Sequence, residues 1–403
     1  MLWGIFVMVS RIVVTGHGVT AQAVQAYCDR MGYPCVSRSD TEICAHDWVV
    51  MSPGVDPQSV PLPAGAVMLS EVEFAYREWQ RLPADQRPQL IGVTGTNGKS
   101  TTATLIATVL DCPVVGNIGD PLIGYVGRDY PWLVCELSSY QLELCDQFTC
   151  SIAVLLNIQP DHLERHKTLE AYIRAKMTIV NTATRFVFYN ASDGHLSAQL
   201  AMMPEPIKRA IYPEVLAGYS ILESRPSNWL SVQAAVSVGG LVGVDAGVMR
   251  ERMACFRGLP HRMERVMGGP AGVRVYNDSK ATNPAAVAMA VASVVEESPV
   301  ILILCGQPKA TCHAALCGQI NRQVTAVVVC GGMVPMVTDW VAQGQLTVPV
   351  TGVDTVAESV EAAFELAAGT GVVLFSPAGS SQDAFETFAQ RGDAFKACVV
   401  AWR

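Results

Sequence analysis

Residues 93–102 read VTGTNGKSTT, and this stretch decides the fold. An apolar run over 90–94 predicts a buried strand, and a helix is predicted over 99–110. Gly95 and Gly98 let backbone N–H groups approach a ligand closely, and the helix N-terminus adds partial positive charge. The stretch therefore predicts a phosphate-binding loop between a strand and a helix.

The side chains of this loop also fit nucleotide chemistry. Lys99 would reach the β- and γ-phosphates of a nucleotide, and the Ser100 hydroxyl would bind Mg²⁺. The spacing departs from the strict GxxxxGK[ST] pattern, whose first glycine falls on Val93. The alternative is a tight strand–helix turn that carries a lysine by chance, although both glycines, the lysine and the hydroxyls stand in register.

Strands and helices alternate along the whole chain. Further helices are predicted near 20–30 and 169–180, and continuous apolar runs predict further strands. These runs cover 11–15, 132–135, 151–158, 273–276, 300–305, 325–330 and 372–375. Strands that are apolar throughout are buried on both faces, so the pattern predicts an α/β protein with mainly parallel sheets.

Two polar, proline-bearing stretches divide the chain of 403 residues. They lie at 80–89 (QRLPADQRPQ) and at 258–262 (GLPHR). We therefore predict three domains, covering residues 1–84, 85–259 and 260–403.

The composition narrows the classes of partner. The chain has 28 Lys and Arg against 36 Asp and Glu, and its net charge of −8 argues against broad nucleic-acid binding and against docking on an anionic membrane. No run reaches the roughly 18 apolar residues of a membrane span. The apolar residues 1–9 lack the flanks of a signal peptide. The 13 cysteines form no CxxC pair, which fits a reducing cytoplasm.

The residue type alone does not decide the role of three more residues. Glu136 ends the apolar run at 132–135, where a carboxylate can hold Mg²⁺ or place negative charge at a helix N-terminus. His162, just past the run at 151–158, is either part of a metal site or a solvated loop histidine. Lys176 falls in a predicted helix and by itself reads as a surface lysine.

Residues 16–21, GHGVTA, form a GxGxxA turn after the first predicted strand. This turn is a weak dinucleotide signal, because only Asp40 lies near the spacing of a ribose-binding acid. Such a turn suits a pyrophosphate whichever nucleotide bears it.

The stretch TGTNGKST resembles the ATP-binding loop of the Mur ligases and of their relatives, the folylpolyglutamate synthases. Dispersed blocks extend the resemblance toward the C-terminus. They are GNIG (116–119), ELSSYQLE (136–143), NIQPDHLERH (157–166), YIRAK (172–176), NDSKATN (277–283) and SPAGSSQDAFETFAQRGDAF (376–395). NDSKATN and the AQRGDAF tail resemble the Mur ligases that add D-glutamate.

This resemblance implies three α/β domains: a Rossmann-like N-terminal domain for a UDP substrate, a central P-loop domain for ATP, and a Rossmann-like C-terminal domain for the amino acid. It implies an ATP-dependent amide ligase of peptidoglycan precursor synthesis. ATP would phosphorylate the carboxylate of UDP-N-acetylmuramoyl-L-alanine, and the amine of D-glutamate would then displace phosphate. The family pattern also implies two Mg²⁺ ions and a cytoplasmic protein, and we expect a monomer without a nucleic-acid partner.

The resemblance assigns roles to individual residues. The expected ATP-binding residues are Gly95, Thr96, Asn97, Gly98, Lys99, Ser100, Thr101, Thr102, Asn228, Arg262 and Asp278. The expected substrate-binding residues are Gly16, Gly18, Thr20, Asn117, Thr282, Lys309, Ser381, Gln382 and Phe388. The expected Mg²⁺ ligands are Ser100, Glu136, His162 and Lys176, with Lys176 carbamylated, and the expected catalytic residues are Lys99, His162, Lys176 and Lys280.

One stretch departs from the family pattern. Residues 227–231, SNWLS, keep Asn228 but carry Ser227 and Ser231 where the family has a histidine and a second asparagine. The departure puts an adenine contact at Ser231 in question.

Two alternative functions stay open. The first is a folylpolyglutamate-type synthase or another amino-acid-adding Mur ligase, against which the GxGxxA turn and NDSKATN argue. The second is a non-catalytic P-loop module that closes on ATP to recruit a partner. Lys99, Ser100, Glu136 and His162 argue against this second alternative, because a module without catalysis has no need of them.

Overall fold

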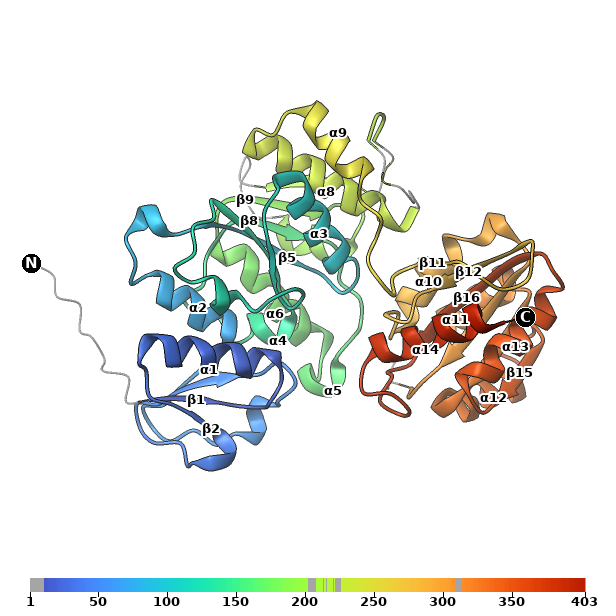
Figure 1. Cartoon of the computed structure of the whole chain (residues 1–403), viewed down its shortest axis with the longest axis horizontal. Coiled ribbons are helices and arrows are strands. Elements are labelled where there is room, and N and C mark those ends of the chain that lie inside the picture. The colour runs from blue at the N-terminus through green and yellow to red at the C-terminus, as the bar shows by residue number, and fades with distance from the viewer. Residues whose placement is uncertain are drawn as a thin grey trace, which may run out of the picture. The chain divides into compact units, whose positions relative to one another are not determined.

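The computed structural model describes residues 11–201, 208–212, 214, 216–219, 221, 226–308 and 313–402, with residues 226 and 227 described by their backbone alone. Helices alternate with strands that form three sheets (Figure 1). The chain divides into two compact units. The first holds the chain up to Ile158 with His162–Ser220 and Asn228–Phe256; the second holds Gln159–Asp161, Ile221–Ser227 and Arg257–Arg403.

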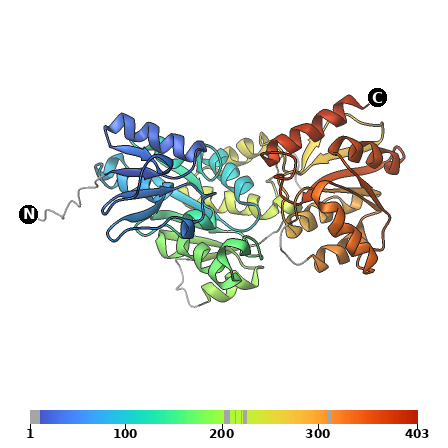
Figure 2. The same ribbon diagram turned by 90° about the horizontal axis from the view of Figure 1, so that it is seen from below.

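The first sheet has four parallel strands in the order β2-β1-β3-β4. These strands are β1 (Ile12–Val14), β2 (Cys35–Ser37), β3 (Trp48–Met51) and β4 (Val67–Ser70). Helix α1 (Val19–Met31) packs on this sheet, as Figure 2 shows, and α2 (Glu71–Trp79) follows β4. Strands β1 and β3 are buried, and the GHGVTA turn leaves the carboxyl end of β1.

Two buried glutamates of α2 join the first sheet to the second within the first unit. The Glu73 carboxylate accepts hydrogen bonds from three successive backbone N–H groups of residues 146–148, at 2.8–3.1 Å. The Glu71 carboxylate accepts one from the Ile123 N–H at 2.6 Å. Burial raises the pKa of Glu71 to about 7, so the Glu71 carboxyl group gains or loses its proton near neutral pH.

The second sheet has six parallel strands in the order β10-β9-β8-β5-β7-β6. These strands are β5 (Gln89–Thr94), β6 (Val114–Gly116), β7 (Trp132–Glu136), β8 (Cys150–Leu155), β9 (Ala183–Asn190) and β10 (Lys208–Ile211). The accompanying helices are α3 (Lys99–Leu110), α4 (Ser139–Leu142), α5 (Leu163–His166), α6 (Leu169–Thr182), α7 (Gly194–Leu200), α8 (Pro226–Val242) and α9 (Ala246–Ala254).

Close packing of α6 on β5 fixes the centre of the second sheet. A Cβ at Gly92 in β5 would lie 2.8 Å from Cδ1 of Ile179 in α6, so a larger residue there would require Ile179 to shift. Strand β8 is buried along its whole length, as its apolar sequence predicts. The strand predicted over 151–158 is nevertheless too long, because β8 ends at Leu155 and Asn157 turns to hydrogen-bond the loop after β5.

The third sheet has the order β11-β12-β16-β13-β14-β15, with β11 antiparallel and the others parallel. These strands are β11 (Glu264–Val266), β12 (Val273–Asn277), β13 (Val300–Cys305), β14 (Ala326–Cys330), β15 (Val350–Val353) and β16 (Gly371–Ala378). The helices are α10 (Pro284–Ala292), α11 (Ala314–Gln323), α12 (Val334–Ala342), α13 (Val356–Ala367) and α14 (Phe388–Ala401).

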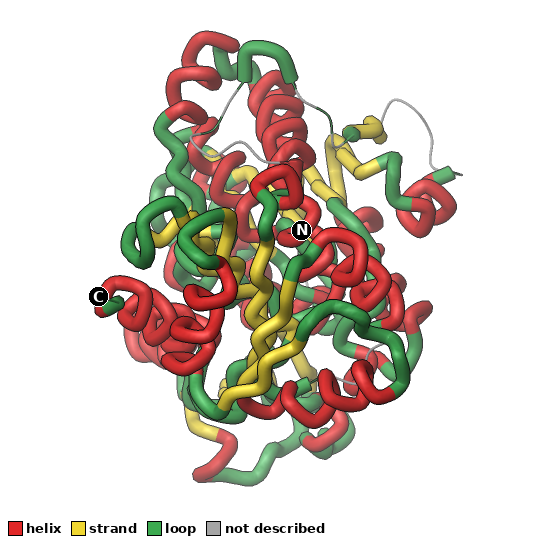
Figure 3. The backbone as a smooth tube through the Cα atoms, turned by 90° about the vertical axis from the view of Figure 1, so that its right-hand side faces the viewer, coloured by secondary structure: helices red, strands yellow, loops and turns green. Residues whose placement is uncertain are grey.

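Helices lie on both sides of this third sheet (Figure 3). Alternate residues of β13 belong to different core layers: Leu302 and Leu304 pack with α10 and α11, while Ile301 and Ile303 pack with α13 and α14. This alternation follows from the two-residue period of a strand. The expected α/β class with parallel sheets is confirmed, whereas the exact domain limits after residues 84 and 259 stay a prediction.

Candidate active site

The loop between β5 and α3, residues 95–98, is called the P-loop below. Gly95 has φ +151° and Gly98 has φ +85°, conformations that favour glycine. A Cβ at Gly95 would lie 3.0 Å from the Cβ of Leu156, so the loop packs closely against the chain that follows β8. Gly98 caps α3 without a side-chain hydrogen bond, and the N-terminus of a helix favours an anion through its backbone N–H groups and dipole.

Asn157 braces the P-loop, a role that the sequence analysis did not assign. Its backbone carbonyl accepts from the Thr96 N–H at 2.9 Å, and its side chain exchanges hydrogen bonds with Asn97 at 2.8 and 3.0 Å. Asn157 follows β8, which neighbours β5 in the sheet. A polar residue directly after the strand beside the P-loop strand was the available sequence signal.

Two lysines reach the P-loop from different helices. Lys99 Nζ donates to the carbonyls of Gly95 and Thr96 at 2.9 and 2.8 Å. Lys176 Nζ, from α6, donates to the same Gly95 carbonyl at 2.8 Å. Lys176 is buried and its Nζ lies 4.6 Å from the centre of the Tyr172 ring, so its reading as a surface lysine is wrong.

Glu136 is the last residue of β7, beside β5, and is buried. Its Oε1 accepts from Asn117 Nδ2 at 2.7 Å, and the Asn117 N–H donates to the Glu136 carbonyl at 2.9 Å. Within the described part of the chain, Glu136 Oε2 is one of a few buried side-chain atoms without a hydrogen-bond partner. A buried carboxylate oxygen without a partner fits a ligand for a cation.

His162 lies in an aromatic cluster near the P-loop. It caps α5 with φ +57°, and its Nδ1 lies 2.8 Å from the Tyr140 hydroxyl oxygen. Its ring is 6.4 Å from that of Tyr172, whose hydroxyl lies 3.0 Å from the Thr96 hydroxyl. A left-handed conformation at a non-glycine residue is unusual, and here it holds the imidazole in a fixed place.

The helix α3 is also tied to α8. The hydroxyls of Thr102 and Ser231 lie 2.8 Å apart, and both residues are buried. Ser231, one of the two departures from the family pattern, therefore bonds to the helix that follows the P-loop. Asn228 lies one turn earlier in α8, and the side chain of Ser227 lies outside the described residues.

The first sheet presents its own glycine turn. Gly16 has φ +77°, and a Cβ there would lie 3.0 Å from Oγ of Ser52, which follows β3. Gly18 caps α1 without a side-chain hydrogen bond, and Thr20 lies in the first turn of α1. The turn therefore offers helix N–H groups beside the carboxyl ends of β1 and β3.

In the second unit, Asp278 follows β12 and is buried. Its carboxylate accepts from the Ser376 hydroxyl at 3.0 Å and from the Met263 N–H at 3.2 Å. Burial raises the pKa of Asp278 to about 7, while Ser376, the Met263 N–H and the Arg262 charge counteract this rise. The expected nucleotide contacts Arg262 and Asp278 thus lie close enough to interact.

The NDSKATN and AQRGDAF blocks meet around Phe388. Lys280 Nζ lies 3.9 Å from the centre of the Phe388 ring, and the Ser279 hydroxyl donates to the Phe388 carbonyl at 2.7 Å. Ser381 is buried near this region, where the neighbouring Ser380 pairs with Gln307 through two backbone hydrogen bonds of 2.8 Å. Thr282 is half-buried, Gln382 is exposed, and Lys309 lies outside the described residues.

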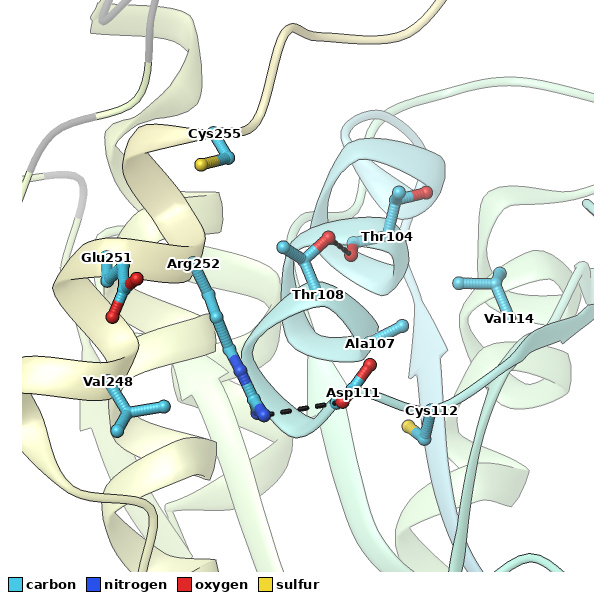
Figure 4. Close-up of a pocket in the computed structure, with 10 residues that line it drawn as sticks. All are labelled: Thr104, Ala107, Thr108, Asp111, Cys112, Val114, Val248, Glu251, Arg252 and Cys255. Carbon is cyan, nitrogen blue, oxygen red and sulfur yellow. Dashed lines mark hydrogen bonds and ion pairs between the residues drawn. The ribbon is translucent and has the colours of Figure 1, made fainter.

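A separate pocket of about 700 Å³ lies between α3 and α9 (Figure 4). Arg252 donates to the Val109 carbonyl at 2.6 Å and lies 3.4 Å from the Asp111 carboxylate. These contacts cap the C-terminal end of α3, whereas the P-loop lies at its N-terminal end. The pocket contains none of the residues that the sequence analysis assigned to a site.

Two family models match different parts of this chain. Residues 93–212 match the Mur ligase middle domain, and residues 261–379 match the Mur ligase glutamate ligase domain. The fold is similar to UDP-N-acetylmuramate-alanine ligase from Thermotoga maritima, with a TM-score of 0.61 and 18% identity over 96% of this chain and 98% of that one. It is also similar to the MurF ligase from Thermotoga maritima in complex with ADP, with a TM-score of 0.60 and 16% identity over 98% and 99% of the two chains.

The chain belongs to the Mur ligase family, which confirms the resemblance and the ligase class predicted from the sequence. Among its relatives, the UDP-N-acetylmuramoylalanine--D-glutamate ligase of Gloeobacter violaceus is 36% identical over 88% of this chain and 84% of that protein. The ligase of the same name from Sphingopyxis alaskensis is 32% identical over 98% and 94%. Among the described residues, no helix is long and apolar enough to cross a membrane.

Proposed function

We propose that this chain joins D-glutamate to UDP-N-acetylmuramoyl-L-alanine at the expense of ATP, as the names of its relatives state for those proteins. The observation that carries the proposal is the convergence of Lys99 and Lys176 on the Gly95 carbonyl. Lys99 at this glycine-rich loop suits the charge of a triphosphate, and Lys176, once modified as argued below, would support the Mg²⁺ that accompanies it.

The residues around Glu136 fit a magnesium site. Among the described residues, no three His, Cys, Asp or Glu side chains gather closely enough to hold a metal ion. Mg²⁺ is usually bound by one or two carboxylates together with water and substrate phosphates, so its site does not require such a cluster. Ser100, Glu136 and His162 would contribute the protein ligands, and the bound ion would neutralise phosphate charge.

Lys176 would carry a CO₂-derived carbamate. The amine nitrogen adds to the carbon of CO₂ and loses a proton, so that one N–H remains and two oxygens are gained. The remaining N–H can still donate to the Gly95 carbonyl, and the oxygens would support Mg²⁺. The burial of Lys176 supports this assignment, because a buried ammonium is costly and a neutral amine is the form that reacts.

The proposed reaction has two chemical steps. The substrate carboxylate attacks the γ-phosphorus of ATP, forming an acyl phosphate and releasing ADP. The D-glutamate amine then attacks the acyl carbon, and phosphate leaves from the tetrahedral intermediate. Lys99 offsets the charge of the transferring phosphoryl group, and Lys280 offsets charge near the reacting phosphate.

The remaining expected residues bind the three substrates. Gly16, Gly18 and Thr20 would hold the UDP pyrophosphate at the N-terminus of α1, and Asn117 would contact the sugar nucleotide. The D-glutamate site would comprise Thr282, Lys309, Ser381, Gln382 and Phe388. Asn228, Arg262 and Asp278 would contact ATP. Because ATP and a UDP-sugar are its substrates, we expect the protein to act in the cytoplasm, as a monomer.

An amino-acid panel tests this function. Purified protein is incubated with ATP, Mg²⁺ and UDP-N-acetylmuramoyl-L-alanine, and phosphate release is measured with D-glutamate, L-glutamate, L-alanine and a diamino acid. We expect release with D-glutamate alone, because the wrong isomer leaves a charge without its partner, at about 1–3 kcal/mol or more. Preference for another amino acid would identify a different family member. Nucleotide binding without any turnover would identify the non-catalytic module.

A further inference from the structure

The second unit contains two cysteines that face each other at the carboxyl ends of neighbouring strands. Cys305 ends β13 and Cys330 ends β14, and the two residues are direct partners in the parallel pairing of these strands. Both side chains belong to the apolar layer beneath α13 and α14, so they point to the same face of the sheet. Partners on adjacent strands lie about 4.8 Å apart, within the Cα separation that a disulfide spans.

The two thiols already interact. Interaction between the two thiols, together with burial, raises the pKa of Cys305, and interaction with Cys305 lowers the pKa of Cys330. The Arg391 guanidinium, buried in α14, lies beside the same strand end, because a Cβ at Gly306 would be 2.5 Å from its Nη1. A thiol pair beside a buried cation favours a thiolate, which is the reactive form of cysteine.

The chain that follows each cysteine leads to the proposed amino-acid site. Cys305 precedes Gly306, where a Cβ would lie 2.2 Å from the Ser380 carbonyl oxygen. Gln307 then pairs with Ser380, next to Ser381. After Cys330, the N–H of Gly332 donates to the Asp383 carboxylate at 3.0 Å.

Arg391 connects the same loops. Its guanidinium donates to the Ser279 carbonyl at 2.8 Å and to the Gly379 carbonyl at 3.1 Å. Ser279 lies in the NDSKATN block, and Gly379 directly follows β16. Arg391 therefore links both blocks to Gly306, the residue after Cys305.

We propose that Cys305 and Cys330 form a peroxide-sensitive dithiol site, whose oxidation to a disulfide displaces the loops of the amino-acid site and weakens D-glutamate binding. The effect on D-glutamate rests on the proposed function, whereas the dithiol site does not.

The oxidation balances with hydrogen peroxide as oxidant. The Cys330 thiolate attacks one peroxide oxygen, the O–O bond breaks, and hydroxide leaves and takes up a proton to give water and a sulfenic acid. The Cys305 sulfur then attacks the sulfenic sulfur, the S–O bond breaks, and the second hydroxide leaves with the Cys305 proton as water. Two thiols and one peroxide thus give one disulfide and two waters.

Burial selects the oxidant and explains the effect. Cys305 is 4% exposed and Cys330 1% exposed, so a bulky disulfide is excluded and the oxidant that we propose is the small molecule hydrogen peroxide. A disulfide holds its sulfurs about 2.05 Å apart, closer than any hydrogen-bonded pair of thiols. Both side chains must therefore leave their present packing, and we expect the change to reach the loop after β13, where Gly306 lies so close to Ser380 that a Cβ would overlap its carbonyl oxygen.

The test uses the full chain, reduced and then treated with hydrogen peroxide, alkylated and mapped by mass spectrometry. We expect a cross-linked peptide pair containing Cys305 and Cys330 and a rise of about tenfold in KM for D-glutamate. The KM for the UDP substrate should stay unchanged, and dithiothreitol should reverse both effects. Absence of this cross-link would overturn the dithiol site, and a cross-link with unchanged KM would overturn its action on the amino-acid site.

Two variants provide the comparison. Cys330→Ala should keep the KM of the reduced protein and lose its sensitivity to peroxide. Cys35→Ala is the matched control, since Cys28 and Cys35 lie on the contacting elements α1 and β2 of the first unit; this variant should remain sensitive. Sensitivity that persists in Cys330→Ala contradicts the proposal.

The peptide map separates the test of the dithiol site from the test of the proposed function. If Cys330→Ala does not fold, the map of the unmodified chain and the variant Cys305→Ala still decide the question. A reduced protein that does not use D-glutamate would refute the proposed function, while the map would still report the disulfide.

Discussion

Lys99 and Lys176 donate to one acceptor, because their Nζ atoms lie 2.9 and 2.8 Å from the carbonyl oxygen of Gly95. The two residues stand on different helices, α3 and α6, and are 77 positions apart in the sequence (176 − 99). Their meeting places two lysine side chains at the P-loop. The first two predictions separate the roles of these groups.

Replacing Lys99 by alanine should abolish ligation while the fold remains intact. Lys99 supplies positive charge to the phosphates, and loss of one such group typically costs a factor of about 100–1,000 in kcat. Steady-state kinetics at saturating ATP measure the loss, and thermal unfolding checks the fold. Lys396→Ala, which removes a lysine bound to Glu264 and Asp393, serves as the control. Near-normal turnover of Lys99→Ala would refute the assignment.

Replacing Lys176 by alanine should remove most activity, and acetate or formate should restore part of it. The small carboxylate would occupy the place of the carbamate oxygens. Lys176→Arg cannot form a carbamate, so it should stay inactive with or without carboxylate. Incubation with ¹³C-labelled bicarbonate should produce a carbamate resonance in the NMR spectrum. This resonance reports the modification independently of activity. Full activity of Lys176→Arg would mean that the residue acts only as a positive charge.

Replacing Asn157 by alanine should loosen the P-loop. The change removes both side-chain hydrogen bonds to Asn97, and we expect ATP affinity to fall about tenfold and stability to fall by about 1–3 kcal/mol. Affinity for the UDP substrate should be unchanged, which isothermal titration can measure. Asn321→Ala is a matched control, because Asn321 also makes two side-chain hydrogen bonds to a loop. Equal weakening of both ligands would indicate general unfolding instead of a local effect.

The first sheet should bind a uridine nucleotide and not NAD. The GHGVTA turn can hold a pyrophosphate, but Asp40 is exposed in a short 3-10 helix, η1 (Arg38–Asp40), and offers no clear ribose contact. Titration of the whole protein with a UDP-sugar and with NAD⁺ distinguishes the two ligands. Tight binding of NAD⁺ that the UDP-sugar does not displace would overturn this reading.

The stability of the first unit should depend on pH through Glu71. The carboxyl group has an ordinary pKa of 4.5 and a folded pKa of about 7, so between these values the folded state binds more protons. The free energy of unfolding should therefore fall as pH rises from 4.5 to 7, by about 3 kcal/mol. Glu71→Gln should lose this part of the decline, as chemical denaturation at several pH values would reveal. An identical pH profile in wild type and variant would exclude Glu71 as the cause.

The sequence by itself determined the P-loop, the parallel α/β class and the family blocks. Glycine spacing, a buried apolar strand and a following helix are local patterns, so residues 93–102 were sufficient to predict the start of α3 at Lys99. The blocks around NDSKATN and AQRGDAF could be assigned because they keep residue types in a fixed order. The role of Asn157 was not found, because its partners Thr96 and Asn97 lie about 60 residues earlier in the chain.

Only the tertiary structure decided which side chains meet. Lys176 reads as a surface residue from its helix alone, yet α6 packs on β5 and Lys176 is buried with its Nζ on the Gly95 carbonyl. The sequence already made Glu136 a candidate Mg²⁺ ligand, but only the structure showed that its Oε2 is buried without a hydrogen-bond partner in the described part of the chain. Cys305 and Cys330, 25 positions apart, face each other because β13 and β14 pair in that register. Local periodicity specifies strands and helices, whereas burial and contact depend on how sheets and helices pack across long separations in sequence.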